Sequence, residues 1–244
     1  MDLEGIRTHL RRTAWGDFPE VVVYAEPVLV RSHASYGAAK GGDAIAAEAL
    51  VDEVITMLGV PPSVPVLGTA RPYLLAVHAV ETVGMNAIPR ALARSLSKIL
   101  GLPLASGVIQ INRVTHTGAD GYHRLAFPAL FDGNVEAEDY VLIDDFVGQG
   151  GTLANLKGFV ESNGGRVVGA AVLSGKAYSA KLRLDQNGLD ELRRKHGTRL
   201  EEWWTATFGY GFERLTASEA RYLTRVDNAD SIPERLALAG RAGD

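Results

Sequence analysis

The sequence predicts an α/β protein in which a central, mostly parallel sheet is flanked by helices. Two observations support this prediction. Apolar runs of strand length recur, as at residues 73–80 and 140–143, and continuous runs of this kind are typical of strands covered on both faces. Segments with helical periodicity lie between these runs, and strand–helix–strand units form parallel sheets.

The first part of the chain alternates between strand and helix patterns. Residues 20–30 are rich in β-forming side chains, with Pro27 at a break or an edge position. Residues 43–58 place apolar side chains at helical spacing, and Asp43 is a suitable N-cap. Residues 73–80 then predict a buried strand.

The middle of the chain continues this alternation. A helix is expected to start near Ile88–Pro89 and to end at Gly101, because proline is tolerated in the first turn and glycine favours the C-terminus. Its apolar face would comprise Ile88, Leu92, Leu96 and Ile99. Residues 104–111 predict the next strand, whereas residues 113–138 show no clear period and predict a long functional or mobile loop.

A second strand–helix–strand unit follows. Residues 140–143 predict a buried strand, Asp144–Thr152 a glycine-rich turn, Leu153–Glu161 a helix and residues 166–173 another strand. The apolar face of this helix would comprise Leu153, Leu156, Phe159 and Val160. The unit predicts two adjacent parallel strands.

The last quarter of the chain differs in composition. Residues 181–244 hold 11 basic and 11 acidic residues among 64, which predicts a solvated helical appendage. Residues 187–195 and 198–206 are expected to be helical. Two capping-box patterns, Thr216–Glu219 and Ser231–Glu234, predict two further helix starts.

Residues 140–152, YVLIDDFVGQGGT, carry the most specific chemical pattern of the sequence. Asp144 and Asp145 end the predicted strand, and three glycines within four positions precede Thr152. Glycines let several backbone N–H groups approach one anion, and a helix N-terminus adds donors and a positive dipole end. The carboxylates can accept hydrogen bonds from sugar hydroxyls or help hold a hydrated Mg²⁺. The pattern predicts a sugar-phosphate site at the carboxyl edge of the sheet.

This order of four apolar residues, Asp-Asp and a glycine-rich loop ending in threonine resembles the signature of type I phosphoribosyltransferases. In that family the signature binds the ribose 5-phosphate part of phosphoribosyl pyrophosphate (PRPP). The resemblance implies that Asp144 and Asp145 accept hydrogen bonds from the ribose 2- and 3-hydroxyls. It also implies a 5-phosphate held by Gly148, Gln149, Gly150, Gly151 and Thr152.

Two further segments match the family by position. The loop after an early core strand holds pyrophosphate in the family, and here it would comprise Thr82, Val83, Gly84, Met85 and Asn86. A long flexible loop precedes the signature in the family, and here it would be Val114–Gly133, with His116, His123 and Arg124. From their place in this loop, Arg124 is expected to meet the leaving pyrophosphate and His123 to take part in proton transfer.

Two positions depart from the family pattern. Members that act on 6-oxopurines carry an acidic residue beside the base nitrogen where this chain has Gly148. The glycine argues against that substrate class. Gln149 stands where the family has a small hydroxyl residue, so backbone donors would contribute more of the phosphate binding here.

The resemblance implies a Mg²⁺-dependent transfer of a phosphoribosyl group from PRPP to a nitrogenous base, with Mg²⁺ carried by PRPP and pyrophosphate released. It implies a single phosphoribosyltransferase-like domain over residues 1–244, with its core at about 60–180 and flanking parts at 1–60 and 181–244. The flanking parts would supply the hood over the base and the helical appendage. A homodimer is expected, and the histidines show no metal-ligand spacing.

Two alternatives remain open. A protein of this fold could bind PRPP only as a regulator or assembly factor, and Gly148 is compatible with that role. Residues 145–152 also resemble the first motif of amino-methyltransferases, which binds S-adenosylmethionine. That function requires an acidic residue at the end of the next strand, and residues 166–175 contain none.

Two other segments have a structural and a functional interpretation. The aromatic residues Trp203, Trp204, Tyr210 and Phe212 could line a base-binding hood, but a place in the core or in a dimer contact is favoured. Lys40-Gly41-Gly42 could contact a phosphate, but a turn that leads into a helix is favoured.

Composition excludes several classes of protein. The chain has no cysteine, which rules out disulfides, iron–sulfur clusters and a thiol nucleophile. Its net charge of −4 does not favour a nucleic-acid partner. There is no run of about 18 apolar residues to span a membrane, and the first residues lack a signal-peptide pattern. A cytoplasmic protein without a membrane partner is expected.

Overall fold

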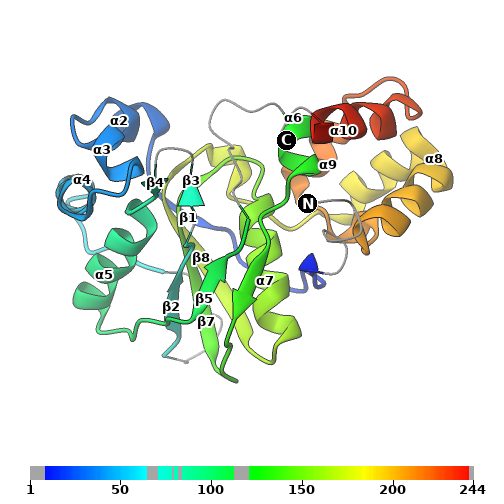
Figure 1. Ribbon diagram of the computed structural model, residues 1–244. Coiled ribbons are helices and arrows are strands. Elements are labelled where there is room, and N and C mark those ends of the chain that lie inside the picture. The colour runs from blue at the N-terminus through cyan, green and yellow to red at the C-terminus, as the bar shows by residue number, and fades with distance from the viewer. Residues whose placement is uncertain (1–8, 65–70, 79, 82–83, 113–120, 242–244) are drawn as a thin grey trace.

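The computed structural model describes residues 9–64, 71–78, 80–81, 84–112 and 121–241 (Figure 1). At its centre lies a parallel four-stranded sheet in the order β1-β8-β7-β2. Its strands are β1 (Val22–Ala25), β2 (Tyr73–Ala76), β7 (Asp139–Val147) and β8 (Arg166–Gly175). The helices α4 (Ala44–Met57), α5 (Ile88–Leu100) and α7 (Gly151–Ser162) pack against this sheet. The predicted α/β class with a parallel sheet and flanking helices is therefore confirmed.

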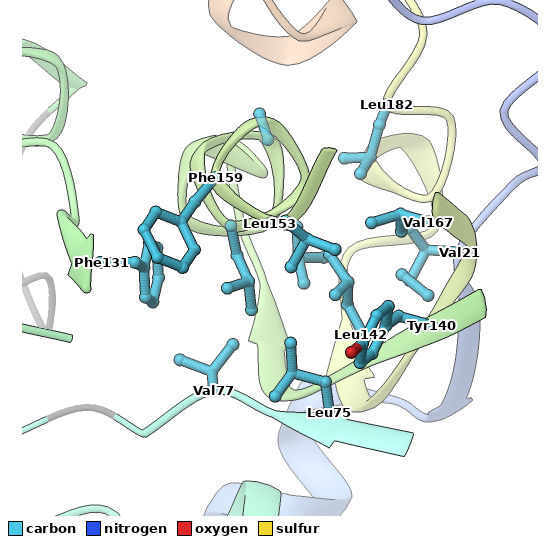
Figure 2. Close-up of a cluster of buried hydrophobic side chains, with 14 of the residues drawn as sticks. Val21, Leu75, Val77, Phe131, Tyr140, Leu142, Leu153, Phe159, Val167 and Leu182 are labelled. Atoms are coloured by element: carbon cyan, nitrogen blue, oxygen red, sulfur yellow. The ribbon is translucent and has the colours of Figure 1, made fainter. Parts of the chain in front are cut away.

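The sheet separates two apolar layers, because successive strand residues face opposite sides. Leu142 of β7 faces α7, where it packs with Leu153 and Phe159 (Figure 2). Its neighbours Val141 and Ile143 face α4 and α5 on the other side. The strand is thus buried on both faces, as its continuous apolar sequence predicts.

A third apolar cluster holds the C-terminal helices together, beside the sheet (Figure 1). These helices are α8 (Gln186–Phe208), α9 (Ala217–Thr224) and α10 (Ser231–Arg241). Trp204, Phe208 and Phe212 are fully buried among them. The aromatic residues Trp204, Tyr210 and Phe212 therefore belong to a core, as the sequence favoured.

Several local predictions are confirmed. The Asp43 side chain caps α4 by accepting hydrogen bonds from the amides of Ile45 and Ala46. Gly101 ends α5 in the left-handed conformation, at φ 67°. Thr216 and Glu219 form the predicted capping box of α9. The two predicted helical segments of residues 187–206 are joined in α8, which has a non-helical kink at Gly197.

Other local predictions are wrong at the ends of elements. Pro27 does not lie in a strand but starts the short helix α2 (Pro27–Ser32), after β1 has ended at Ala25. Ile99 is 46% exposed and does not join the apolar face of α5. Ser231 does not cap α10, because it lies inside that helix and its hydroxyl donates to the carbonyl of Asn228.

The predicted turn at Asp144–Thr152 begins later than expected. Strand β7 continues to Val147, because β8 continues to Gly175 and supplies backbone partners for both Asp144 and Phe146. Both aspartates therefore lie on the last part of a strand, and only residues 148–150 form the turn.

The predicted loop at residues 113–138 contains regular structure in its described part. Helix α6 (Gly121–Ala126) buries Tyr122 and Leu125 in the C-terminal cluster and packs on α10. Strand β6 (Phe131–Gly133) pairs antiparallel with β5 (Val108–Gln110), so residues 104–111 do not add a strand to the parallel sheet. Leu104 alone of that segment bridges to β2.

The structure also contains several short elements. They are the helix α3 (Tyr36–Lys40), the antiparallel pair β3 (Val80–Glu81) and β4 (Gly84–Met85), and 3₁₀ turns at Ala177–Ser179 and Phe212–Arg214. Over the ranges described, no helix combines the length and the apolar character needed to cross a membrane.

Candidate functional site

A cavity of about 310 Å³ lies at the carboxyl end of β7, where the predicted sugar-phosphate pattern ends. This volume is at the lower end of the range that is usual for small-ligand sites. Most of its lining comes from five parts of the chain: the N-terminal segment, the α2–α3 region, the α6 region, the β7–α7 connection and the C-terminal region. Val77, Asn86 and Gln110 complete the described lining. All seven residues predicted to hold ribose 5-phosphate line it: Asp144, Asp145, Gly148, Gln149, Gly150, Gly151 and Thr152.

Asp144 and Asp145 occupy different environments although they are adjacent. The Asp144 carboxylate is buried and accepts a hydrogen bond of 2.8 Å from the backbone N–H of Asp145. Burial raises the pKa of Asp144 well above its ordinary value, and the charge of Asp145 raises it further, whereas Lys40 opposes the rise. Asp145 is more accessible, and its Oδ2 lies 3.0 Å from the Lys40 ammonium.

Lys40 joins the site from a distant part of the sequence. It is the last residue of α3, and Gly41 and Gly42 lead from it into the capped start of α4. The segment is therefore the predicted helix-leading turn, but its lysine also lines the cavity and pairs with Asp145. Sequence reasoning missed this contact because the two residues are 105 positions apart.

The glycine loop packs against Leu182 and the start of α9 without room for side chains. Gly150 has φ 82°, and a Cβ there would come 2.3 Å from Leu182 Cδ2. A Cβ on Gly151 would come 2.8 Å from Glu219 Oε1. The Thr216 hydroxyl donates a 2.6 Å hydrogen bond to the carbonyl of Gln149. The N-cap of α9 therefore fixes the loop on the side that faces the C-terminal region.

Thr216 determines how one peptide of this loop is oriented. In a trans peptide the C=O and the following N–H point in opposite directions. Because Thr216 binds the Gln149 carbonyl, the N–H of Gly150 is directed away from Thr216. The carbonyl oxygen, which would repel an anion, is held on the side of α9.

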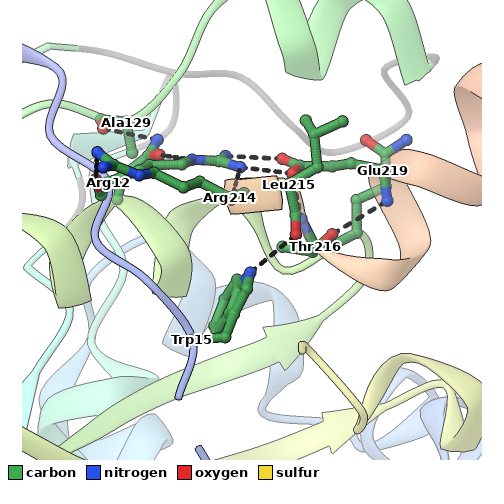
Figure 3. Close-up of polar contacts among 9 residues, drawn as sticks. Arg12, Trp15, Ala129, Arg214, Leu215, Thr216 and Glu219 are labelled. Atoms are coloured by element: carbon green, nitrogen blue, oxygen red, sulfur yellow. Dashed lines mark hydrogen bonds and ion pairs between the residues drawn. The ribbon is translucent and has the colours of Figure 1, made fainter. Parts of the chain in front are cut away.

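A buried ion pair connects the N-terminal segment to the same wall (Figure 3). The Arg12 guanidinium donates to both carboxylate oxygens of Glu219, at 2.6 and 2.8 Å, and to the Asn155 side chain of α7 at 2.8 Å. It also lies 4.7 Å from the centre of the Tyr210 ring. Burial is the largest single effect and lowers the pKa of Arg12, but the charge of Glu219, the Tyr210 hydroxyl and the hydrogen bonds to Glu219 together outweigh it, so the net shift is upward. Arg12 therefore stays charged.

Nearby contacts extend this connection. The Trp15 indole donates to the Leu215 carbonyl at 2.9 Å, and Arg214 donates to the Arg12 carbonyl at 2.7 Å (Figure 3). The charge pattern predicted a solvated helical appendage, but the C-terminal region also contributes to the cavity. It forms one wall of the cavity and is tied to α7 through the N-terminal segment.

Two more cationic side chains reach the cavity. Arg31 of α2 lies 5.1 Å from the centre of the Phe146 ring. Arg124 of α6 lies against Gly148, where an added Cβ would come 2.7 Å from Arg124 Nη1. Arg124 thus lies beside the glycine loop and belongs to a helix rather than to the expected flexible loop. Its contact with the leaving pyrophosphate stays a prediction.

The other predicted site residues are placed differently. His123 packs against Phe127, with tilted rings whose centres are 4.7 Å apart, and is not among the described residues that line the cavity. Of the predicted pyrophosphate loop, Asn86 lines the cavity, Gly84–Met85 forms β4, and Thr82 and Val83 lie outside the described residues. His116 also lies outside them.

Within the described ranges, no group of three or more His, Asp or Glu side chains could hold a metal ion. Asp144 and Asp145 provide two carboxylates in the cavity, so Mg²⁺ would need oxygen ligands from a bound phosphate as well. The donor set fits a metal that arrives with its ligand better than one held by the protein alone.

Comparison with known proteins finds relatives over most of the chain. No protein-family model matches the sequence. The chain is 38% identical over 229 residues to Protein TraN of Escherichia coli, which is 93% of this chain and 51% of TraN. An uncharacterized protein of Haemophilus influenzae is 38% identical over 151 residues, which is 61% of this chain and 34% of that protein. The chain thus spans about half the length of TraN.

Among solved structures, two adenine phosphoribosyltransferases are similar to the chain at low identity. The enzyme from Thermoanaerobacter pseudethanolicus has 18% identity and a TM-score of 0.33, over 73% of this chain and 90% of that one. The enzyme from Leishmania donovani has 13% identity and a TM-score of 0.32, over 81% of this chain and 74% of that one.

Proposed function

We propose that the chain binds PRPP in this cavity and transfers its phosphoribosyl group to a nitrogenous acceptor, with release of pyrophosphate. One observation carries the proposal: the acid pair, the glycine loop and the N-terminus of α7 line a single cavity together with basic side chains. This combination suits a sugar that carries phosphate groups, since hydroxyls need acceptors and phosphates need N–H donors and positive charge.

Each part of the site has a distinct task in this proposal. The backbone amides of residues 148–152 would bind the 5-phosphate, helped by the positive end of the α7 dipole. Asp144 and Asp145 would accept hydrogen bonds from the ribose hydroxyls. Mg²⁺ would arrive with PRPP and neutralise the pyrophosphate that leaves.

The chemical step requires no covalent nucleophile. A lone pair of the acceptor nitrogen forms the bond to the ribose C1 while the bond from C1 to pyrophosphate breaks, and pyrophosphate keeps the electron pair. Any proton on that nitrogen passes to water. The residues of the cavity would accelerate this step by positioning both partners and by stabilising the developing charges.

A second candidate function is binding of PRPP without catalysis, as in a regulator or assembly factor. Two observations favour it: position 148 has no acidic side chain, and the Asp145 carboxylate is occupied by Lys40. The methyltransferase alternative has less support, because none of the described residues that line the cavity belongs to β8. An S-adenosylmethionine site of that kind needs an acid at the end of that strand.

Calorimetry with PRPP and Mg²⁺, and separately with S-adenosylmethionine, tests the proposal. The expected result is binding of PRPP by the wild-type chain and strong weakening by Asp145→Asn, with Asp132→Asn, an exposed change on β6, as the matched control. Pyrophosphate release is then measured with a panel of purines, pyrimidines and pyridines. Binding without release across the panel would support the regulator. Binding of S-adenosylmethionine alone would refute both.

A further inference from the structure

An ion pair inside the cavity engages one of the two acids expected to bind the sugar. Lys40 Nζ lies 3.0 Å from Asp145 Oδ2, and both residues line the cavity. Their side chains are 14% and 13% exposed, so little water reaches the pair. The other acid, Asp144, is buried and accepts the N–H of Asp145. Asp145 is therefore the more accessible acceptor for a sugar hydroxyl, and Lys40 already holds one of its oxygens.

The backbone around Lys40 is fixed by contacts with the start of α5. Lys40 is the last residue of α3, and the carbonyl of the fully buried Ala39 accepts a 3.1 Å hydrogen bond from the N–H of Ala87. Gly42 has φ 105°, and a Cβ there would come 2.9 Å from the Met85 carbonyl oxygen. The ammonium can therefore leave the carboxylate by rotation of the flexible lysine side chain, without movement of α3.

A neutral hydroxyl replaces this ammonium at a cost. The contact between Lys40 and Asp145 is a hydrogen bond between two charged groups, whereas a hydroxyl brings no charge to the carboxylate. A hydroxyl that displaces Lys40 separates two opposite charges where little water reaches them, and this separation costs more there than at the surface. The ion pair therefore opposes binding of a sugar hydroxyl at Asp145.

A second anionic group on the ligand changes this balance. Lys40 can then exchange the Asp145 carboxylate for an oxygen of that group and keep an ionic contact. PRPP carries such a group on the ribose C1, whereas ribose 5-phosphate carries a hydroxyl there. The ribose and the 5-phosphate are common to both molecules. The ion pair therefore separates two ligands that the acids and the glycine loop alone would bind alike.

We infer that Lys40 is a specificity-determining residue. Its ion pair with Asp145 competes with the ribose hydroxyls and selects sugar phosphates that carry a second anionic group over simple sugar monophosphates. This inference rests on the proposed binding of PRPP and adds discrimination against ribose 5-phosphate. It implies that removal of one positive charge from the cavity strengthens the binding of a phosphorylated ligand, whereas simple attraction between charges implies the opposite.

Calorimetry with three probes tests the inference. The probes are ribose 5-phosphate, methyl phosphate, which has the phosphate but no sugar, and PRPP with Mg²⁺. Lys40→Met and Lys40→Gln remove the charge, and Lys40→Arg retains it. Lys98→Met, an exposed change on α5, is the matched control. Thermal unfolding of each variant establishes that the protein is folded.

The affinity for ribose 5-phosphate should rise about tenfold in Lys40→Met, because the hydroxyls no longer displace a charged donor. Methyl phosphate has no hydroxyl to place on Asp145, so its affinity should stay unchanged or fall. PRPP gains access to Asp145 but loses its contact with Lys40, so its affinity should change by less than about threefold. Lys40→Arg and Lys98→Met should behave like the wild type. In an Asp145→Asn background, Lys40→Met should no longer change the affinity for ribose 5-phosphate.

Two outcomes would overturn the inference while the proposed function survives. An unchanged or lower affinity for ribose 5-phosphate in folded Lys40→Met and Lys40→Gln would show that the hydroxyls do not compete with Lys40. An equal gain for methyl phosphate would place the effect at the phosphate rather than at Asp145. If the wild type binds no PRPP but Lys40→Met shows the gain for ribose 5-phosphate, the proposed function fails and the competition stands. If no folded variant binds any probe, both fail.

Discussion

The buried pair Arg12–Glu219 offers the sharpest test of how the C-terminal region is joined to the sheet. Both side chains are only 3% exposed, and the two contacts are 2.6 and 2.8 Å long. Removing one member of such a pair leaves the other as an uncompensated buried charge, which typically costs about 3–5 kcal/mol. We expect this loss in the unfolding free energy of both Arg12→Met and Glu219→Gln.

Glu219→Gln separates the charge from the capping role of this side chain. Glutamine can still accept the hydrogen bond that Glu219 Oε2 receives from the Thr216 amide, so the capping box survives. Arg12→Met should cost more than Glu219→Gln, because it also removes the hydrogen bonds to Asn155 and to the Arg214 carbonyl. The double variant should cost less than the sum of the two, since no unpaired charge remains.

Urea unfolding followed by tryptophan fluorescence measures these losses, because Trp15 and Trp204 lie on the two sides of the connection. The matched control is Arg193→Met on α8. Arg193 makes an equally short paired contact with Glu201 but is 42% exposed, so its removal should cost less than about 1 kcal/mol. Equal losses for Arg12→Met and Arg193→Met would refute the role of burial.

Three further changes test other parts of the site. Asp144→Asn should raise the free energy of unfolding at pH 7.5 and raise it much less at pH 4. The reason is that the raised pKa of Asp144 lowers wild-type stability as pH rises above the ordinary carboxyl pKa. An equal gain in the free energy of unfolding at the two pH values would contradict this. Thr216→Val should weaken ribose 5-phosphate binding about fivefold in calorimetry, whereas Thr216→Ser should not, because only serine keeps the hydrogen bond to the Gln149 carbonyl. The control is Leu223→Ala, a buried change in the apolar cluster of the C-terminal helices, which should lower stability but leave this affinity unchanged. Gly158→Ala should lower the free energy of unfolding, measured by thermal unfolding, by about 1–3 kcal/mol, since its Cβ would come 2.1 Å from the Arg11 carbonyl oxygen. The control is Gly37→Ala, because Gly37 has open space around it. Equal losses of stability in the two variants would refute the packing argument.

Elements that depend on neighbouring residues could be predicted from the sequence. The Asp43 cap, the left-handed Gly101 and the capping box of α9 each involve residues within four positions of one another. The β7–α7–β8 unit is also local, since its apolar periods and its glycine turn lie within one continuous segment. These signals are strong because each motif satisfies its own backbone groups.

Helix α6 shows why other elements could not be predicted from the sequence alone. It has six residues, and an isolated helix of that length is unstable in water. It forms because Tyr122 and Leu125 are buried against the C-terminal helices, while Gly121 allows the Tyr222 ring to approach closely. The sequence of residues 113–138 alone does not indicate that this segment packs against the C-terminal helices. The position of Arg124 in the cavity depends on the same packing.

The sequence by itself determined the α/β class, the buried β7 strand and the pattern of acids and glycines that defines the candidate site. Only the tertiary structure decided which charges face that site. Arg12 meets Glu219 across 207 positions and Lys40 meets Asp145 across 105. Local backbone preferences act over a few residues, whereas these pairings follow from how helices pack around the sheet. The charges that surround the acid pair and the glycine loop were therefore set by folding rather than by motif.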